Sequence, residues 1–307
     1  MQFFLIFDQS LLPLLLIVAA AAMYQRFLRT DIRQIATLAL NIFAPLLVFD
    51  SLTRHQTTLP ELWQPFGFMV LLTGCMMALG WLASLALRLS PQDRISLVLA
   101  CSMINIGNFG LPLIYFTFGQ EAVAMSVIIF VVFNIPLTTL AIYVSSDKIQ
   151  TRDMLIDVLK TPIFHAMVLA LLFTGLGWQL PTGLGKGVHL MAEGAIPLLI
   201  FVLGLQLAAF SLNRHWVVYA GAILLALLIR LIASPLVADQ LLALFSFSTL
   251  EHNVALVQTS GPSALLPLMY AIKFNRSPDL LAALIVSTTI ASGISLPVVI
   301  SLLTGQG

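Results

Sequence analysis

Two short stretches of this chain combine glycine, proline and polar side chains inside apolar segments. The first, from Asn105 to Pro112, reads Asn-Ile-Gly-Asn-Phe-Gly-Leu-Pro, and the second, from Gln258 to Ser263, reads Gln-Thr-Ser-Gly-Pro-Ser. Proline lacks an N–H group and clashes with the carbonyl four residues earlier, so each stretch predicts an interrupted helix. In hydrocarbon, such an interruption survives only inside protein or beside a watery cavity.

The chemistry that two such interruptions offer is anion binding. The start of a helix has unpaired N–H groups and an effective charge of roughly +0.5, so two converging starts can hold a carboxylate without a basic side chain. An alternative is that the asparagines only cap one half-helix, or that both stretches are proline kinks without a ligand. We expect the substrate-binding residues to be Asn105, Gly107, Asn108, Pro112, Gln258, Ser260, Pro262 and Ser263.

Three further polar residues are candidates for the same site. Arg230 lies deep in an apolar segment, where an arginine costs at least about 3 kcal/mol; it is either a counter-ion for the substrate or a structural partner of Asp239 or Glu193. Asn41 and Glu193 each precede a proline by four residues, where a freed carbonyl is expected. Glu193 is the proton-coupling candidate if it faces the cavity, and otherwise it lies near the outer interface.

The sequence shows no pattern of an enzyme or of a metal site. Its five histidines are scattered and its two cysteines lack ligand spacing, and neither Gly-x-Ser-x-Gly nor His-Glu-x-x-His occurs. We expect no enzyme activity, no cofactor and no metal ligands. Coupling to protons or to sodium is open: the carbonyls of Asn108 and Gln258 could hold sodium, but the lack of acidic ligands favours protons or exchange.

The composition indicates a membrane protein. Apolar residues make up 60%, charged residues 9%, and the mean hydropathy is +1.03, whereas a soluble domain has roughly 25% charged residues. The net charge of +1 without a basic run argues against nucleic acid, so the expected partners are the lipid bilayer and a small substrate. Apolar runs of membrane length predict ten spans, at residues 3–24, 32–53, 65–88, 94–118, 121–145, 161–180, 187–210, 215–245, 253–273 and 278–303.

Lysine and arginine predict the orientation of these spans. Eleven of the fourteen lie in odd-numbered links, two (Arg54 and Lys186) lie in even-numbered links, and Arg230 lies within a span. By the positive-inside rule the odd-numbered links are cytoplasmic and both termini face outward.

The two halves of the chain repeat. The second span reads Ala-Pro-Leu-Leu-Val-Phe from Ala44, and the seventh reads Ile-Pro-Leu-Leu-Ile-Phe from Ile196. These matches predict a first five-helix repeat at 1–146, a cytoplasmic link at 147–160 and a second repeat at 161–307. Because each repeat holds an odd number of spans, the second enters the membrane inverted, as in many secondary transporters.

The Asn-x-Gly-Asn-x-Gly-Leu-Pro, Gly-Pro-Ser-Ala and Pro-Leu-Leu-x-Phe motifs together resemble the auxin efflux carrier family, which includes the plant PIN exporters and bacterial permeases. The resemblance implies a ten-helix fold akin to the bile-acid sodium symporters, with helices 4 and 9 broken and crossing. It also implies a scaffold of helices 1, 2, 6 and 7, a transport domain of helices 3–5 and 8–10, and substrates such as malonate, malate or lactate. The link is too short to hold the long loop of plant members, which counts against auxin.

We therefore expect an all-α, multi-pass protein of the bacterial inner membrane that transports small organic anions by alternating access. The alternatives are a transporter of auxin-like indole carboxylates and an anion channel. A channel would need a continuous polar stripe along several helices, whereas the polar residues here cluster at mid-membrane. We also expect a homodimer formed through the scaffold helices.

Overall fold

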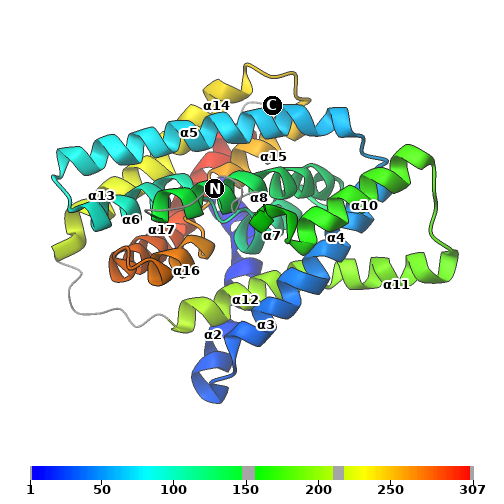
Figure 1. The fold of residues 1–307 in the computed structure, drawn as a ribbon, viewed down its shortest axis with the longest axis horizontal. Helices are drawn as coiled ribbons and strands as arrows, with labels where there is room; N and C mark the ends of the chain where they lie inside the picture. The colour runs from blue at the N-terminus through cyan, green and yellow to red at the C-terminus, as the bar shows by residue number, and fades with distance from the viewer. Residues whose placement is uncertain (1, 147–155, 210–217, 305–307) are drawn as a thin grey trace.

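The computed structural model describes residues 2–146, 156–209 and 218–304, and within these residues the chain is helical and contains no strand (Figure 1). The predicted all-α class is therefore confirmed. Residues 147–155 of the predicted link and 215–217 of the predicted eighth span lie outside the described part.

The α-helices of the first half are α1 (Gln2–Ile6), α2 (Leu12–Leu28), α3 (Ile32–Leu38), α4 (Ala44–Arg54), α5 (Trp63–Ala86), α6 (Pro91–Ser102), α7 (Leu111–Phe118) and α8 (Val123–Ser145). Those of the second half are α10 (Pro162–Leu176), α11 (Thr182–Glu193), α12 (Ala195–Ala209), α13 (Ala220–Leu228), α14 (Ser234–Leu242), α15 (Thr249–Thr259), α16 (Leu266–Lys273) and α17 (Pro278–Thr304).

Seven helical segments among the described residues are long and apolar enough to cross a membrane. Two shorter apolar helices, Ile106–Phe118 and Pro162–Leu176, accompany them. Helices occupy parts of all ten predicted spans, although several boundaries differ: the first continues to Leu28, and the eighth ends at Leu242.

Local sequence sets several helix starts. Asp31, Ser90 and Thr161 each accept a hydrogen bond from a backbone N–H of the first turn that follows. Ser248 and Glu251 form a reciprocal capping box at the start of α15. Such caps satisfy N–H groups that the helix itself leaves unpaired. Three of the four capped helices follow odd-numbered links, and α15 follows an even-numbered one.

In the described part of the chain, four helices contain a π-helical turn that ends two residues before a proline. The wider turn keeps the proline ring clear of the carbonyl that it would otherwise meet, so the helix continues past it. These turns are η1 (Phe7–Leu11), η2 (Ala39–Phe43), η4 (Ile106–Gly110) and η7 (Ile229–Ala233), before Pro13, Pro45, Pro112 and Pro235. Asn41 lies in η2.

The outer surface exposes large apolar side chains. Phe4, Phe27 and Ile290 expose 74%, 81% and 70% of their surface. Monomeric soluble proteins rarely expose contiguous apolar surface on this scale, and the same side chains are favourable against lipid. Together with the apolar helices, this surface indicates a multi-pass membrane protein.

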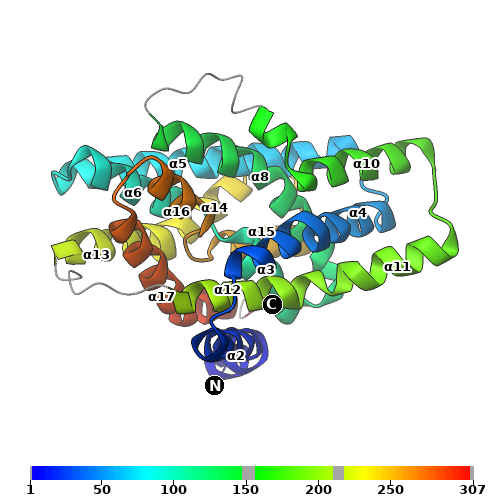
Figure 2. The ribbon, with the colours of Figure 1, turned by 60° about the horizontal axis from the view of Figure 1, so that its bottom comes forward.

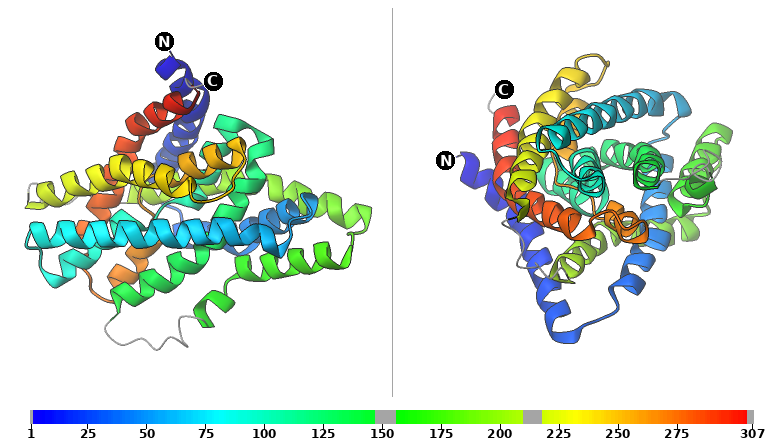
Figure 3. Two further views of the ribbon diagram at one scale, coloured as in Figure 1. Left: turned by 90° about the horizontal axis from the view of Figure 1, so that it is seen from above. Right: turned by 60° about the vertical axis from the view of Figure 1, so that its left-hand side comes forward.

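The helices form two groups in contact with each other. In the first group, α12 crosses α2 in close contact while α10 and α11 pack on α4 (Figure 2). A Cβ atom at Gly204 would lie 2.4 Å from the carbonyl oxygen of Val18, so α12 and α2 touch backbone to backbone. In the second group, α5 packs on α6 and α8, α14 on α15, and α17 on α6 and α13. The first and last helices, α1 and α17, are in contact, and both chain ends lie in the same region (Figure 3).

Candidate functional site

The two interrupted helices meet at their gaps. The first gap separates α6 from η4, and the second separates α15 from α16. Ile104 and Ser263 form an antiparallel β-bridge across the gaps. The amide of Asn105 donates to the carbonyl of Pro262 at 2.9 Å, and the amide of Ala264 donates to the carbonyl of Met103 at 2.8 Å. The backbone groups freed by one interruption are thus paired by the other.

Side chains of the second interruption satisfy carbonyls of the first. The hydroxyl of Ser263 donates to the carbonyl of Ala100 at 2.7 Å. The amide nitrogen of Gln258 donates to the carbonyls of Ile106 at 3.3 Å and Ser126 at 3.2 Å. Ser260 instead donates to the carbonyl of Leu256 in its own helix. Ser263 and Gln258 therefore hold the two broken helices together.

The Arg230 side chain is fully buried at the place where the two interrupted helices meet, which we call the crossing. Its guanidinium donates to the carbonyls of Cys101, Thr259 and Gly261 and to the hydroxyl of Ser234. Neither acidic residue considered as its partner takes that role. Asp239 pairs with His252 at 3.5 Å, and Glu193 pairs with His189 at 3.3 Å.

A cavity of about 680 Å³ lies beside the crossing. It is lined by residues 104–108, where the first half-helix starts, and by residues 264–266, where the second starts. Asn41 also lines it, from η2. The structure therefore brings Asn41, Asn105, Gly107 and Asn108 to one cavity, together with the starts of both half-helices.

Two asparagine amides in this cavity have spare hydrogen-bonding capacity. Asn105 is 6% exposed, and its Nδ2 has no hydrogen-bond partner among the described residues. The Nδ2 of Asn108 donates to the Oε1 of Gln206 at 3.4 Å, which is long for an N–H···O bond. A Cβ atom at Gly107 would lie 2.8 Å from the ring of Phe130, so glycine lets the half-helix approach that ring. The Asn108 amide is therefore only weakly held, and the Asn105 amide, which is closed to solvent, would reach a ligand by turning its side chain.

The other predicted site residues lie behind the cavity wall rather than along it. Pro112, Gln258, Ser260, Pro262, Ser263 and Arg230 are all buried and belong to the crossing itself.

The proline that starts the second half-helix is Pro267, not Pro262. Pro112 occupies the second position of α7, and Pro267 occupies the second position of α16. Pro262 lies in the extended gap, where its carbonyl accepts from Asn105. Pro262 therefore acts in the pairing of the gaps, and Pro267 lies in the first turn of the half-helix that follows.

Several lining residues were missed by sequence reasoning. The polar ones include Gln206, Asn134, Thr138 and Tyr270, and the apolar ones include Phe130, Phe133, Leu137 and Met269. Asn134 and Thr138 are four residues apart and so share a helix face around Pro136, a signal that could have found them. For Gln206, the sequence offered only the general indication that a polar residue in an apolar segment often has a function.

Three charged residues, Arg33, Asp157 and Lys160, belong to the cavity lining, in or beside links that carry most of the lysine and arginine. We infer that the mouth of the cavity lies at these residues, because charged side chains at the starts of helices are solvated more easily than those at mid-membrane.

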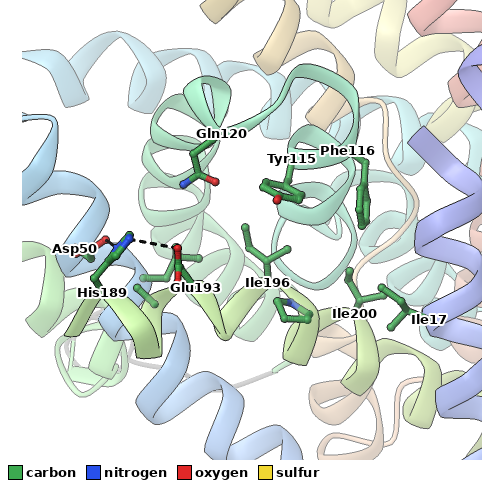
Figure 4. A pocket seen from close by; sticks show the side chains of 12 residues that line it. Ile17, Asp50, Tyr115, Phe116, Gln120, His189, Glu193, Ile196 and Ile200 are labelled. Atoms are coloured by element: carbon green, nitrogen blue, oxygen red, sulfur yellow. Dashed lines mark hydrogen bonds and ion pairs between the residues drawn. The ribbon is translucent and has the colours of Figure 1, made fainter. Parts of the chain in front are cut away.

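A second, smaller pocket of about 320 Å³ holds Glu193 (Figure 4). The His189 ring bridges Asp50, at 2.9 Å, and Glu193. Tyr115 and Gln120 face this trio across the pocket. Glu193 is thus remote from the crossing cavity, and 60% of its side chain is exposed.

Crossed half-helices beside a cavity, within a bundle of membrane-length helices, define a membrane transport protein. The model of the membrane transport protein family matches residues 7–154 and 146–300, so the chain belongs to this family, that of the auxin efflux carriers.

Three relatives are similar to the chain. An uncharacterized transporter of Methanothermobacter thermautotrophicus is 30% identical over 273 residues, covering 87% of each chain. An uncharacterized transporter of Methanocaldococcus jannaschii is 27% identical over 209 residues, covering 66% of each. Auxin efflux carrier component 8 of Arabidopsis thaliana is 25% identical over 118 residues, covering 38% of this chain and 31% of the plant protein.

Proposed function

We propose that the protein is a secondary transporter of small organic anions in the bacterial inner membrane, and that it works by alternating access. The observation that carries this proposal is the shared cavity. The starts of both half-helices face it, and the buried Nδ2 of Asn105 has no partner among the described residues. Each of these features favours a negatively charged group over a neutral or positive one.

The substrate carboxylate would lie between the two half-helix starts. The first residues of η4 have N–H groups without an intrahelical acceptor, and Asn105 and Asn108 add amide donors beside them. Hydrogen bonds to a charged group are worth about 1.5–3 kcal/mol each. Two or three of them would hold a carboxylate at a depth where free charge is costly.

The helix contacts support two inverted repeats. If the first five spans correspond to the last five, span 1 is equivalent to span 6 and span 2 to span 7. The contact between spans 1 and 7 (α2 and α12) then has an equivalent between spans 6 and 2 (α10 and α4), and both contacts are present. The same correspondence relates α5 on α6 to α14 on α15, and α17 on α6 to α8 on α15. This pattern supports ten spans, with a scaffold of helices 1, 2, 6 and 7 and a transport domain of the others.

The charges at the cavity mouth support a cytoplasmic opening. Arg33 and Lys160 belong to the positively charged side, which the positive-inside rule places in the cytoplasm. The proximity of α1 and α17 supports an even number of crossings, and cytoplasmic odd-numbered links would then place both termini outside. In this orientation the pocket of Asp50, His189 and Glu193 faces the opposite side, where Glu193 could exchange protons for coupling.

The apolar wall of the cavity favours a second substrate candidate. Phe130, Phe133, Leu137 and Met269 line it, and its volume lies within the range of sites for drug-sized molecules. A carboxylate with an apolar body, such as an indole carboxylate, would bury that body against this wall. Malonate, malate and lactate would leave the wall in contact with water.

Two experiments test the proposal on purified protein. In a thermal-shift screen of malonate, malate, lactate and indole-acetate, we expect at least one carboxylate to raise the melting temperature, because a ligand that binds only the folded state stabilises it. Counterflow in liposomes then separates carrier from channel: unlabelled substrate inside should accelerate entry of labelled substrate through a carrier. Equal entry with and without it would indicate an open pore and contradict alternating access.

A further inference from the structure

We propose that Arg230 is a resident cation of the crossing. Its guanidinium fills a cluster of backbone carbonyls that could otherwise bind a free cation, so the crossing needs no sodium ion at that place. This inference goes beyond the carboxylate site, because it concerns the opposite ends of the broken helices.

The contacts of Arg230 are with helix ends. Its Nη1 donates to the carbonyl of Cys101 at 3.1 Å, one residue before α6 ends. Its Nη2 donates to the carbonyl of Thr259, the last residue of α15. Its Nε donates at 3.0 Å to the carbonyl of Gly261, within the second gap. One side chain therefore ties together the carboxyl ends of the two first half-helices.

The charge of the guanidinium matches that of these helix ends. A helix carboxyl end carries an effective charge of roughly −0.5, so the ends of α6 and α15 together carry about one negative charge. A guanidinium supplies one positive charge and up to five N–H donors in a fixed fork. Arg230 is stabilised by backbone dipoles, and among the described residues it forms no salt bridge with a carboxylate.

The position of Arg230 on its own helix fixes this geometry. It lies in the π-helical turn η7, and the hydroxyl of Ser234, one turn later, accepts from Nη2 at 2.6 Å. The side chain is fully buried. An arginine at this depth is costly unless all of its surroundings are polar, and here three carbonyls and a hydroxyl supply that environment.

The same carbonyls are of the kind that holds coupling ions in other transporters with broken helices, where unwound carbonyls and half-helix carboxyl ends coordinate sodium. In this chain the guanidinium already occupies them. The positive charge also lies on the crossing that carries the proposed carboxylate site, so it favours an anion there without touching it.

The first test uses the intact protein. The melting temperature and the counterflow rate should be the same in sodium and in choline buffers. A rise in melting temperature specific to sodium, or a requirement of transport for sodium, would overturn the proposal. The melting temperature reports on the crossing whatever the substrate is, so failure of this arm is distinguishable from failure of the carboxylate proposal.

The second test replaces the cation. Arg230→Ala should lower the counterflow rate by about tenfold or more, because removing one partner of a buried charged network leaves the others unsatisfied. Guanidinium at low, non-denaturing concentration should restore part of the rate and of the melting temperature. Urea, which has a similar shape and no charge, is the matched control and should restore neither.

The outcomes of this second test are decisive in either direction. Wild-type behaviour of Arg230→Ala, or equal rescue by urea, would overturn the proposal, since the charge would then be dispensable. Should Arg230→Ala fail to fold, Arg230→Lys keeps the charge and should yield folded protein with a lower melting temperature. A neutral Arg230→Met variant that is as stable as Arg230→Lys would contradict the role of the charge.

Discussion

The backbone amide of Asn105 donates to the carbonyl of Pro262 at 2.9 Å and so joins the two interrupted helices, one from each half of the chain. Backbone pairs and the side chains of Ser263, Gln258 and Arg230 close the crossing, so the Asn105 side chain is not needed for that purpose. Its Nδ2 is left buried at the cavity without a partner among the described residues. A buried donor without a partner costs about 1–3 kcal/mol, and an anionic ligand would remove that cost.

Asn105→Ala should weaken carboxylate binding by roughly tenfold to a hundredfold, the equivalent of one hydrogen bond to a charged group. The measurement is the concentration of carboxylate needed to raise the melting temperature. Asn253→Ala, on α15 and outside the cavity lining, is the matched control and should bind as the wild type does. Unchanged binding in Asn105→Ala would remove this side chain from the site.

Asn108→Ala should abolish uptake without loss of folded protein. Asn108 lines the cavity, and its long bond to Gln206 at 3.4 Å leaves it free to turn toward a ligand. Uptake of labelled substrate into liposomes, at equal amounts of folded protein judged by gel filtration, measures the effect. A variant with wild-type rate and affinity would contradict the proposed site.

Gly107→Ala should impair binding by moving the half-helix start. The added methyl group would lie 2.8 Å from the Phe130 ring, so either the ring or the backbone must shift. Phe130→Leu in the same chain should restore part of the affinity, because it removes the ring. Gly293→Ala, where nothing lies within 4 Å of the added atom, should leave binding unchanged. Equal effects of Gly107→Ala and Gly293→Ala would show that this close approach is unimportant.

Ser263→Ala should lower the stability of the fold by about 1 kcal/mol or somewhat more, because it leaves the carbonyl of Ala100 without this donor. Denaturation in mild detergent measures the change. Thr117→Val is the control: that hydroxyl is half-buried and donates to the carbonyl of Leu113 within its own helix. A loss no larger than that of the control would mean that Ser263 does not hold the crossing.

Thr138→Cys should report the side to which the cavity opens. In a background with Cys75 and Cys101 replaced by alanine, a membrane-impermeant thiol reagent should label this position from the cytoplasmic side only. Carboxylate should slow the labelling, because Thr138 lines the cavity. Labelling from the outer side alone would reverse the orientation that the Arg33 and Lys160 charges predict.

The interruptions were predictable because their causes are local. Pro112 and its neighbouring glycines indicate an interruption in this apolar segment, but the gap lies at residues 103–105 and the helix continues past Pro112. The motif repeated at Pro45 and Pro197 relates the halves. The register of the second break was not predictable, because Pro262 and Pro267 are both plausible helix breakers. The pairing of Ile104 with Ser263 in the structure shows that Pro262 lies in the gap and that Pro267 lies in the helix after it.

The cavity wall and the partners of Arg230 were not predictable for a different reason. Gln206 and Asn134 lie on continuous helices, and which face of a continuous helix meets a cavity depends on its rotation against neighbours distant in sequence. The cost of burying Arg230 predicted that it has partners. Its partners are the backbone carbonyls of Cys101, Thr259 and Gly261. Every residue has a backbone carbonyl, so the sequence does not indicate which carbonyls bind the guanidinium.

The close approach at Gly204 has a consequence for movement. The backbones of α12 and α2 leave no space for a methyl group between Gly204 and Val18, so a larger residue at position 204 would push these helices apart. On its other side α12 meets η4, where the long bond between Gln206 and Asn108 spans the contact. In the transport cycle proposed above, we therefore expect α12 to stay with α2 and the movement to occur between α12 and η4.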